Sequence, residues 1–411
     1  MKKLLGTIMS GFLVVGLLTG CGGGESGASD DGTVSLEFFQ FKSEAVGTYD
    51  TLIAKFEEEH PNIKIEQNHV PEPGTVLMSR LSQNDVPEIV AYNGDKVYGE
   101  AAKGGAFVDF TGDKIVEKII PSYIDMINLL SDNEQINGLP HSANANTVLY
   151  NKTKFEELGL EIPTTWDEFI ELAEEIEAAG ETPFYSPYGE AWTALPPFNA
   201  LASNLHGDDF FEKRHAEETT FADRYQEVSE KMLTLLEYTD NDVFGTNYNQ
   251  ANTAFANGES VMYMMGVWAI SQIQEANPDI ELGAFALPAS NNADENRLVS
   301  GVDTLLTISA TAQHPEEART FVEFLLEEEN VQFYIDEQKL FSAVENVFQK
   351  DPTVADLQVH FEEGTITSFA DHYYYPGMQV ENLIQEFLIN KDVDQFLQTM
   401  DNEWDKVQSR Q

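Results

Sequence analysis

The sequence lacks most of the residues on which enzyme and metal sites depend. It holds one cysteine, Cys21, so no disulfide can form within the chain, and a chain of 411 residues can bury a core without one. The eight histidines show no metal-ligand spacing, and the HExxH, GxSxG and Walker A motifs are absent. We therefore expect no metal, no cofactor and no enzyme activity. Carboxylates pair by chance in so acidic a chain, so a secreted carbohydrate-active enzyme stays an alternative.

Basic residues are also scarce. The chain has 23 Lys and Arg against 71 Asp and Glu, a net charge of −48 at pH 7. Such a surface repels nucleic acid and anionic lipid headgroups, which excludes both as direct partners. Salt in the surroundings would screen the self-repulsion. The hydrophobic content of 42% favours a folded chain over a disordered one.

The apolar run Leu4–Leu18 is shorter than the ~20 residues that span a bilayer. It follows two lysines, and this pattern predicts a secretory signal peptide over residues 1–20. The run ends in Leu-Thr-Gly before Cys21 and so resembles the bacterial lipobox, which implies cleavage before Cys21 and its lipidation. A plain signal peptide is the alternative. The glycine-rich residues 21–32 predict a flexible tether.

Strand and helix signals alternate after the tether. Val34–Phe41 and Ile63–Val70 read as strands, with a helix between them over Thr48–His60. Further along, Thr165 and Glu168 form a capping box that starts a helix. The alternation predicts an α/β fold with mostly parallel sheets, whose strand ends point at a cleft.

The segment Gln135–Ile176 carries a family resemblance. It runs G-L-P, small polar residues, V-L-Y-N-K, a helix, then P-T-T-W-D-E-F. The order resembles the extracellular solute-binding proteins of bacterial sugar ABC importers, the maltose-binding-protein-like family 1. Two further stretches support the resemblance: F-E-E-E-H-P-N-I-K-I before residue 66, and A-N-G-E-S-V-M-Y-M-M-G-V-W ending at Trp268.

The resemblance implies a periplasmic-binding-protein-like fold with two lobes joined by crossing hinge strands near 140–146, 299–304 and 343–350. Lobe 1 would comprise residues 33–143 with 303–346, and lobe 2 residues 144–302 with 347–411. The implied function is capture of a carbohydrate between the lobes and its delivery to the membrane permease of an ABC importer. We expect a monomer at the extracellular face of the cell membrane, attached through the lipid anchor only.

Sugar chemistry indicates which residue types would form the site. Aromatic rings cover the apolar face of a sugar, and carboxylates and amides bond its hydroxyls. Residues of these types stand at the expected strand ends and helix starts, and the resemblance places ligand contacts at most of them. They are Phe39, Phe41, Glu44, Tyr92, Asn93, Tyr188, Trp192, Trp268 and Asp303.

Each of these side chains has an alternative role in packing or capping. Strand alternation must bury either Phe39 or Phe41, where relatives often carry Trp, and Asp303 could instead cap a strand end. Trp166 and Trp404 lie on helical faces and are assigned to packing. An anionic ligand would need clustered basic residues, whereas Lys42 appears isolated in the sequence. We therefore expect a neutral mono- or oligosaccharide, with a cationic polyamine as the alternative.

Overall fold

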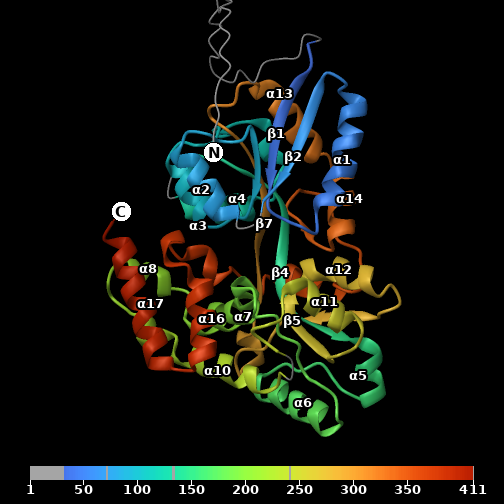
Figure 1. The fold of residues 1–411 in the computed structure, drawn as a ribbon, viewed down its shortest axis with the longest axis vertical. Helices are drawn as coiled ribbons and strands as arrows, with labels where there is room; N and C mark the ends of the chain where they lie inside the picture. The colour runs from blue at the N-terminus through green and yellow to red at the C-terminus, as the bar shows by residue number, and fades with distance from the viewer. Residues whose placement is uncertain (1–31, 71–72, 132–134, 240–241, 411) are drawn as a thin grey trace, which may run out of the picture.

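The structure is a computed structural model that describes residues 32–70, 73–131, 135–239 and 242–410. The predicted signal peptide, Cys21 and the tether up to residue 31 lie outside the described residues. The chain forms two lobes, one above the other in Figure 1, and two long strands run vertically between them. The two-lobe α/β fold expected from the sequence is confirmed.

Lobe 1 holds the first three strands and the helices that flank them. Its 3-10 helix is labelled η1, and α13 and α14 return to this lobe late in the chain (Figure 1). The elements are β1 (Val34–Gln40), α1 (Val46–Glu59), β2 (Ile63–His69), α2 (Pro73–Ser82), β3 (Ile89–Tyr92), α3 (Lys96–Lys103), η1 (Lys114–Lys118), α4 (Pro121–Ser131), α13 (Pro315–Leu325), α14 (Glu328–Gln338) and β8 (Phe341–Ser342).

Lobe 2 is mainly helical (Figure 1), and it also holds three short strands. Its elements are α5 (Lys152–Leu158), α6 (Trp166–Ala178), η2 (Ala191–Ala194), α7 (Leu195–Leu205), α8 (Phe210–His215), α9 (Phe221–Arg224), α10 (Gln226–Glu237), α11 (Tyr248–Ala256), β5 (Met262–Gly266), η3 (Val267–Ala269), α12 (Ile270–Ala276), β6 (Leu282–Phe285), η4 (Ala293–Glu295), η5 (Ala355–Leu357), α15 (Gln358–Glu363), β9 (Ile366–Thr367), η6 (Ala370–Tyr373), η7 (Pro376–Met378), α16 (Val380–Asn390) and α17 (Val393–Gln408).

The sheet order is β2-β1-β3-β7-β4-β5, with β6 and β8 also paired to β4 and β9 to β7. β1 is parallel to β2 and β3, as expected. The strand pairs around β4 differ from the mostly parallel sheets that the sequence predicts. β4 is antiparallel to each of its partners, β5, β6, β7 and β8. The physical reason is the path of the chain, which passes from lobe 1 to lobe 2 in β4 and returns in β7.

The two crossing strands are β4 (Leu139–Asn151) and β7 (Leu298–Ile308). Their pairing slips twice within a few residues. Pro140 pairs with Leu305 but Ser142 with Thr304, so His141 is an extra residue on β4; Ala143 then pairs with Val302, so Asp303 is an extra residue on β7. The two bulges compensate, and regular pairing continues on both sides. Bulges re-aim side chains, and here they lie where the strands pass between the lobes.

The core of lobe 1 explains why its elements pack as they do. Apolar residues of α1 recur at helical spacing, and Phe56 is fully buried with its ring 4.9 Å from that of Phe321 on α13. Phe38 of β1 lies 5.4 Å from the same ring. Because helices cover both faces of this sheet, neighbouring residues of β1 are buried on opposite faces.

The local signals in lobe 2 are confirmed in the structure. The Thr165 side chain accepts a hydrogen bond from the Glu168 backbone, and Glu168 bonds back, so the capping box starts α6. Trp166 is 8% exposed and Trp404 fully buried, as expected of packing residues.

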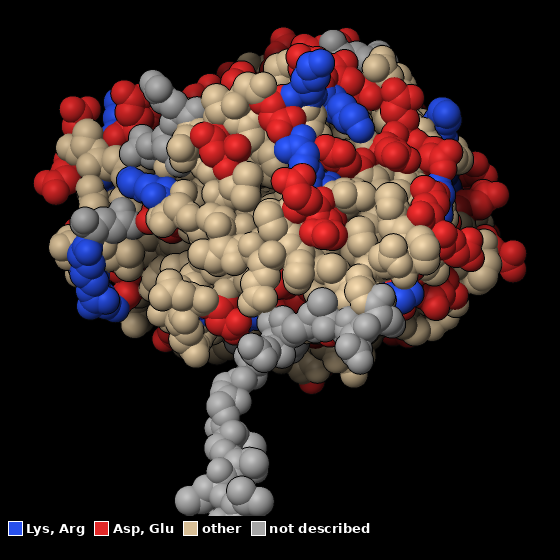
Figure 2. Space-filling model, turned by 90° about the horizontal axis from the view of Figure 1, so that it is seen from above, with Lys and Arg blue, Asp and Glu red and all other residues tan. Residues whose placement is uncertain are grey.

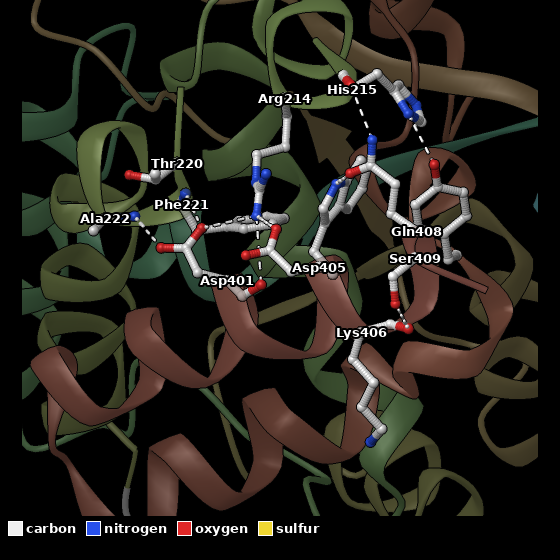
Figure 3. Close-up of polar contacts among 12 residues, drawn as sticks. Arg214, His215, Thr220, Phe221, Ala222, Asp401, Asp405, Lys406, Gln408 and Ser409 are labelled. Atoms are coloured by element: carbon white, nitrogen blue, oxygen red, sulfur yellow. Dashed lines mark hydrogen bonds and ion pairs between the residues drawn. The ribbon is translucent and has the colours of Figure 1, made fainter. Parts of the chain in front are cut away.

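The C-terminal helix α17 is fastened to α8 and α9 by polar contacts (Figure 3). The buried Arg214 forms ion pairs with Asp401 and Asp405, and its guanidinium lies 5.5 Å from the Trp404 ring centre. The Asp401 carboxylate also accepts from the backbone of Phe221 at 2.7 Å, which caps α9. These contacts hold the end of the chain against lobe 2.

Acidic side chains are spread across the face of the molecule shown in Figure 2, with few basic ones between them. The scarcity of Lys and Arg in the sequence thus appears as a surface that is acidic over a wide area. Among the described residues, no helix is both long and apolar enough to cross a membrane.

Candidate functional site

A buried carboxylate marks the point where the crossing strands leave lobe 1. Asp303 receives hydrogen bonds from Lys42 at 2.7 and 2.8 Å and from Asn144 at 2.7 Å. The hydroxyls of Ser142 and Thr304 donate to it at 3.1 and 2.9 Å. A carboxylate has about four lone-pair sites, so these donors occupy the acceptor capacity of Asp303.

The loop after β1 lies against this carboxylate. Lys42 is also 3.7 Å from Glu44, and the Lys42 side chain is 4% exposed. The backbone N–H of Lys42 donates to the Gln40 side chain at 2.6 Å, which fixes the start of the loop. Lys42 is isolated from other basic residues in the sequence, and in the structure it pairs with Asp303, which lies 261 residues away in the chain.

Phe41, the first residue after β1, lies half-buried beside Tyr92 at the end of β3, with ring centres 5.8 Å apart. Asn93 follows Tyr92 and is half-buried. The Tyr92 ring is 5% exposed, and burial raises its pKa well above the usual value. The carboxyl ends of β1 and β3 thus bring three of the predicted site residues to one edge of lobe 1.

Asp95 caps α3 at the same edge and faces lobe 2. Its carboxylate accepts from the backbones of Val97 and Tyr98 at 2.9 and 3.1 Å. Desolvation raises its pKa to about 7, and the Asp371 carboxylate of lobe 2 raises it further against the lowering effect of the cap bonds.

Lobe 2 contributes an aromatic wall. Trp192 is half-buried, donates its indole N–H to Glu190 at 3.0 Å, and lies edge-on to Tyr248 with ring centres 4.9 Å apart. Burial raises the pKa of Tyr248 well above its usual value, and the Glu44 carboxylate raises it further.

Trp268 is half-buried at the end of β5, in η3. Its ring covers Gly266 so closely that a Cβ at that position would lie 1.8 Å from a ring atom. Gly266 is therefore required for the ring to adopt this position, since any side chain there would displace it.

Like Tyr92, two more of the predicted site residues lie in the hydrophobic cores. Phe39 is fully buried in lobe 1, and Tyr188 is 3% exposed in the core of lobe 2. Phe39 and Tyr188 pack against apolar neighbours in these cores, whereas Phe41, Trp192 and Trp268 are each half-buried.

Sequence reasoning missed three residues that belong to this region: Lys42, Asn144 and Tyr248. Asn144 lies within the crossing strand expected near 140–146, and Tyr248 carries no motif in the sequence. No local signal could have found them, because each is defined by a partner from a distant segment. Within the described residues, no three His, Cys, Asp or Glu side chains are grouped so that they could hold a metal ion.

Comparison with known proteins gives the class. Residues 42–332 match the family described as bacterial extracellular solute-binding protein, and the chain belongs to this family. Its relatives are binding proteins, and the chain is a binding protein rather than an enzyme.

Two proteins show which members the chain resembles. It is 31% identical over 367 residues to the multiple sugar-binding protein of Streptococcus mutans, covering 87% of this chain and 85% of the relative. It superposes on RafE in complex with raffinose with a TM-score of 0.82 at 28% identity, covering 92% of this chain and all of the other. The ligand-free form of RafE from Streptococcus pneumoniae superposes less well, with a TM-score of 0.73 at the same identity, covering 92% and 98% of the two chains.

Proposed function

We propose that the chain captures a neutral oligosaccharide in the cleft between its lobes and delivers it to the permease of an ABC importer. The observation that carries the proposal is that both lobes present half-buried aromatic rings, together with a cluster of polar side chains on the crossing strands. Phe41 lies on the lobe 1 side and Trp192 and Trp268 on the lobe 2 side, all half-buried. Half-buried rings keep a face for the apolar side of a sugar.

The polar groups around the rings match the edge of a sugar. Glu44 and Glu190 lie beside the rings, and Asn93 and Asn144 add amides that can both donate and accept. The nearby ammonium of Lys42 is neutralised by Asp303, so no free positive charge is offered to an anionic ligand. Raffinose is the first ligand to test, because RafE binds it and the chain resembles that complex.

The lobes would be residues 33–143 with 303–346 and residues 144–302 with 347–411. In this proposal, ligand binding stabilises the closed arrangement because only there do both lobes contact the sugar. The higher TM-score against raffinose-bound RafE than against the ligand-free form supports a closed arrangement in this structure.

A calorimetric titration tests the ligand class directly. We expect raffinose or a related neutral oligosaccharide to bind and spermidine not to bind, with the chain titrated from residue 22 onward to remove the signal and Cys21. Binding of spermidine alone would favour the polyamine alternative. Sugar cleavage during incubation would overturn the assignment as a binding protein.

We further propose that the mature chain acts as a monomer at the extracellular face of the membrane, held by a lipid on Cys21. The support is the lipobox-like ending of the apolar run and the extracellular family to which the chain belongs. Cys21→Ala should leave the protein unprocessed or release it from the membrane fraction. An unmodified Cys21 in membrane-bound mature protein, seen by mass spectrometry, would contradict the anchor.

A further inference from the structure

The side-chain amide of Asn144 has a defined orientation. Its nitrogen donates to Asp303 Oδ1 at 2.7 Å. A carboxylate can only accept, so the amide nitrogen must face Asp303 and the carbonyl oxygen must point the other way. That oxygen is buried and has no hydrogen-bond partner among the described residues. A buried acceptor without a donor is unfavourable, and a ligand hydroxyl would remove the deficit.

The carboxylate that orients this amide cannot turn freely. Asp303 is the extra residue of the bulge on β7, and the donors from Lys42, Ser142 and Thr304 hold both of its oxygens. Reversing the Asn144 amide would set its carbonyl oxygen against the carboxylate, which is repulsive. The network therefore selects one of the two amide orientations.

Asn144 is also well placed to meet a ligand. It lies half-buried on β4 directly after the two bulges, where the strand leaves lobe 1, and it pairs with Gly301. The Lys42 ammonium that shares Asp303 with it belongs to the loop carrying Phe41 and Glu44. One polar cluster thus connects the floor between the lobes to the loop of lobe 1.

We propose that Asn144 is a ligand contact that accepts one sugar hydroxyl, and that Asp303 and Lys42 are positioning residues that hold its carbonyl oxygen toward the cleft. This inference rests on the proposed function. It assigns Asp303 a different role from the direct contact expected from the sequence, because the donors of the protein already occupy that carboxylate.

The experiment is a titration of the full mature chain with raffinose and with a series of monodeoxy raffinoses. In the wild type, one deoxy analogue should bind about tenfold more weakly than raffinose, as expected for one lost hydrogen bond. Asn144→Ala should weaken raffinose binding by about the same factor and should bind that analogue with no further loss. A merely structural role would weaken all analogues equally and leave the selectivity unchanged.

Asp303→Asn tests positioning. An amide at this place no longer forces the Asn144 nitrogen to face it, so the preference for raffinose over the same analogue should fall toward one. Asn330→Ala is the matched control, a buried asparagine of α14 whose amide bonds the Phe324 backbone at 2.7 Å. It should lower the melting temperature and leave raffinose affinity unchanged.

The outcomes separate the two proposals. If the wild type binds no neutral oligosaccharide, the proposed function is overturned and the role of Asn144 with it. If the wild type binds raffinose but Asn144→Ala binds it with unchanged affinity, the ligand contact is refuted while the function stands. Retained selectivity in Asp303→Asn would refute the positioning role alone.

Discussion

The ion pair between Lys42 and Asp303 should reveal itself in the stability of the ligand-free protein. Their side chains are 4% and 2% exposed. Removing one partner of a buried pair leaves an uncompensated charge, which lowers the free energy of unfolding by about 3–5 kcal/mol. We expect the loss of stability in Asp303→Asn to lie in this range. Lys42 would keep only Glu44, at 3.7 Å, as an acidic partner, and the neighbours of Asp303 are arranged to donate hydrogen bonds to a carboxylate.

The reverse substitution should be milder. In Lys42→Met the Asp303 carboxylate keeps the hydrogen bonds from Ser142, Asn144 and Thr304, so we expect a loss of about 2–3 kcal/mol. The double variant Lys42→Met/Asp303→Asn removes both charges. It should be more stable than Asp303→Asn alone, which gives a coupling between the two sites of about 1–3 kcal/mol.

Urea unfolding followed by circular dichroism, without ligand, measures these differences. The slope of the unfolding free energy with urea should stay constant across the variants, which shows that the same surface is exposed each time. Additive effects in the double variant, or losses below about 1 kcal/mol in both single variants, would show that the pair behaves as a solvated surface contact. The described burial of Asp303 would then be refuted.

Three further predictions follow from single features. Trp268→Ala should weaken sugar binding by about 2–4 kcal/mol, while the melting temperature of the ligand-free protein changes little. Gly266→Ala should have the same effect, because the added Cβ would displace the Trp268 ring. A large loss of ligand-free stability with unchanged affinity would show that Trp268 is a core residue. Burial lowers the pKa of His141 and His206 to about 4. Between pH 6.5 and 4 the unfolded chain therefore binds more protons than the folded one. As the pH is lowered through this range, the free energy of unfolding should decrease by up to ~3 kcal/mol for each histidine. Asp95 opposes this trend, because a carboxyl whose pKa is raised to about 7 stabilises the folded state as the pH is lowered. In Asp95→Asn the free energy of unfolding, measured with urea, should therefore decrease more steeply from pH 7 to pH 5 than in the wild type. An equal slope in the two proteins would contradict this. The melting temperature should rise as sodium chloride is added, because the Debye length shrinks from ~30 Å at low salt to ~8 Å and screens the acidic surface; a flat profile from millimolar to molar salt would count against this.

Signals within a few residues of one another predicted the local structure well. The capping box at Thr165 and the helical spacing that follows it place α6. These features depend on contacts between residues three or four apart, which the sequence displays directly.

Strand alternation was a weaker guide to the site. It required that either Phe39 or Phe41 be buried but did not say which. The structure buries Phe38 and Phe39 together, because helices cover both faces of the sheet, and leaves Phe41 half-buried beside Tyr92. Which ring reaches the site depends on where β1 ends relative to β3, and that is a property of the assembled sheet.

The polar centre of the site was decided by tertiary structure alone. Asp303 was singled out as a polar residue on a crossing strand, but its partners Lys42 and Asn144 lie 261 and 159 residues away. The two compensating bulges that turn these side chains toward one another arise only when β4 and β7 pair. A carboxylate in the sequence can serve as a ligand contact or as a support, and the donors that surround it after folding determine which of the two it becomes.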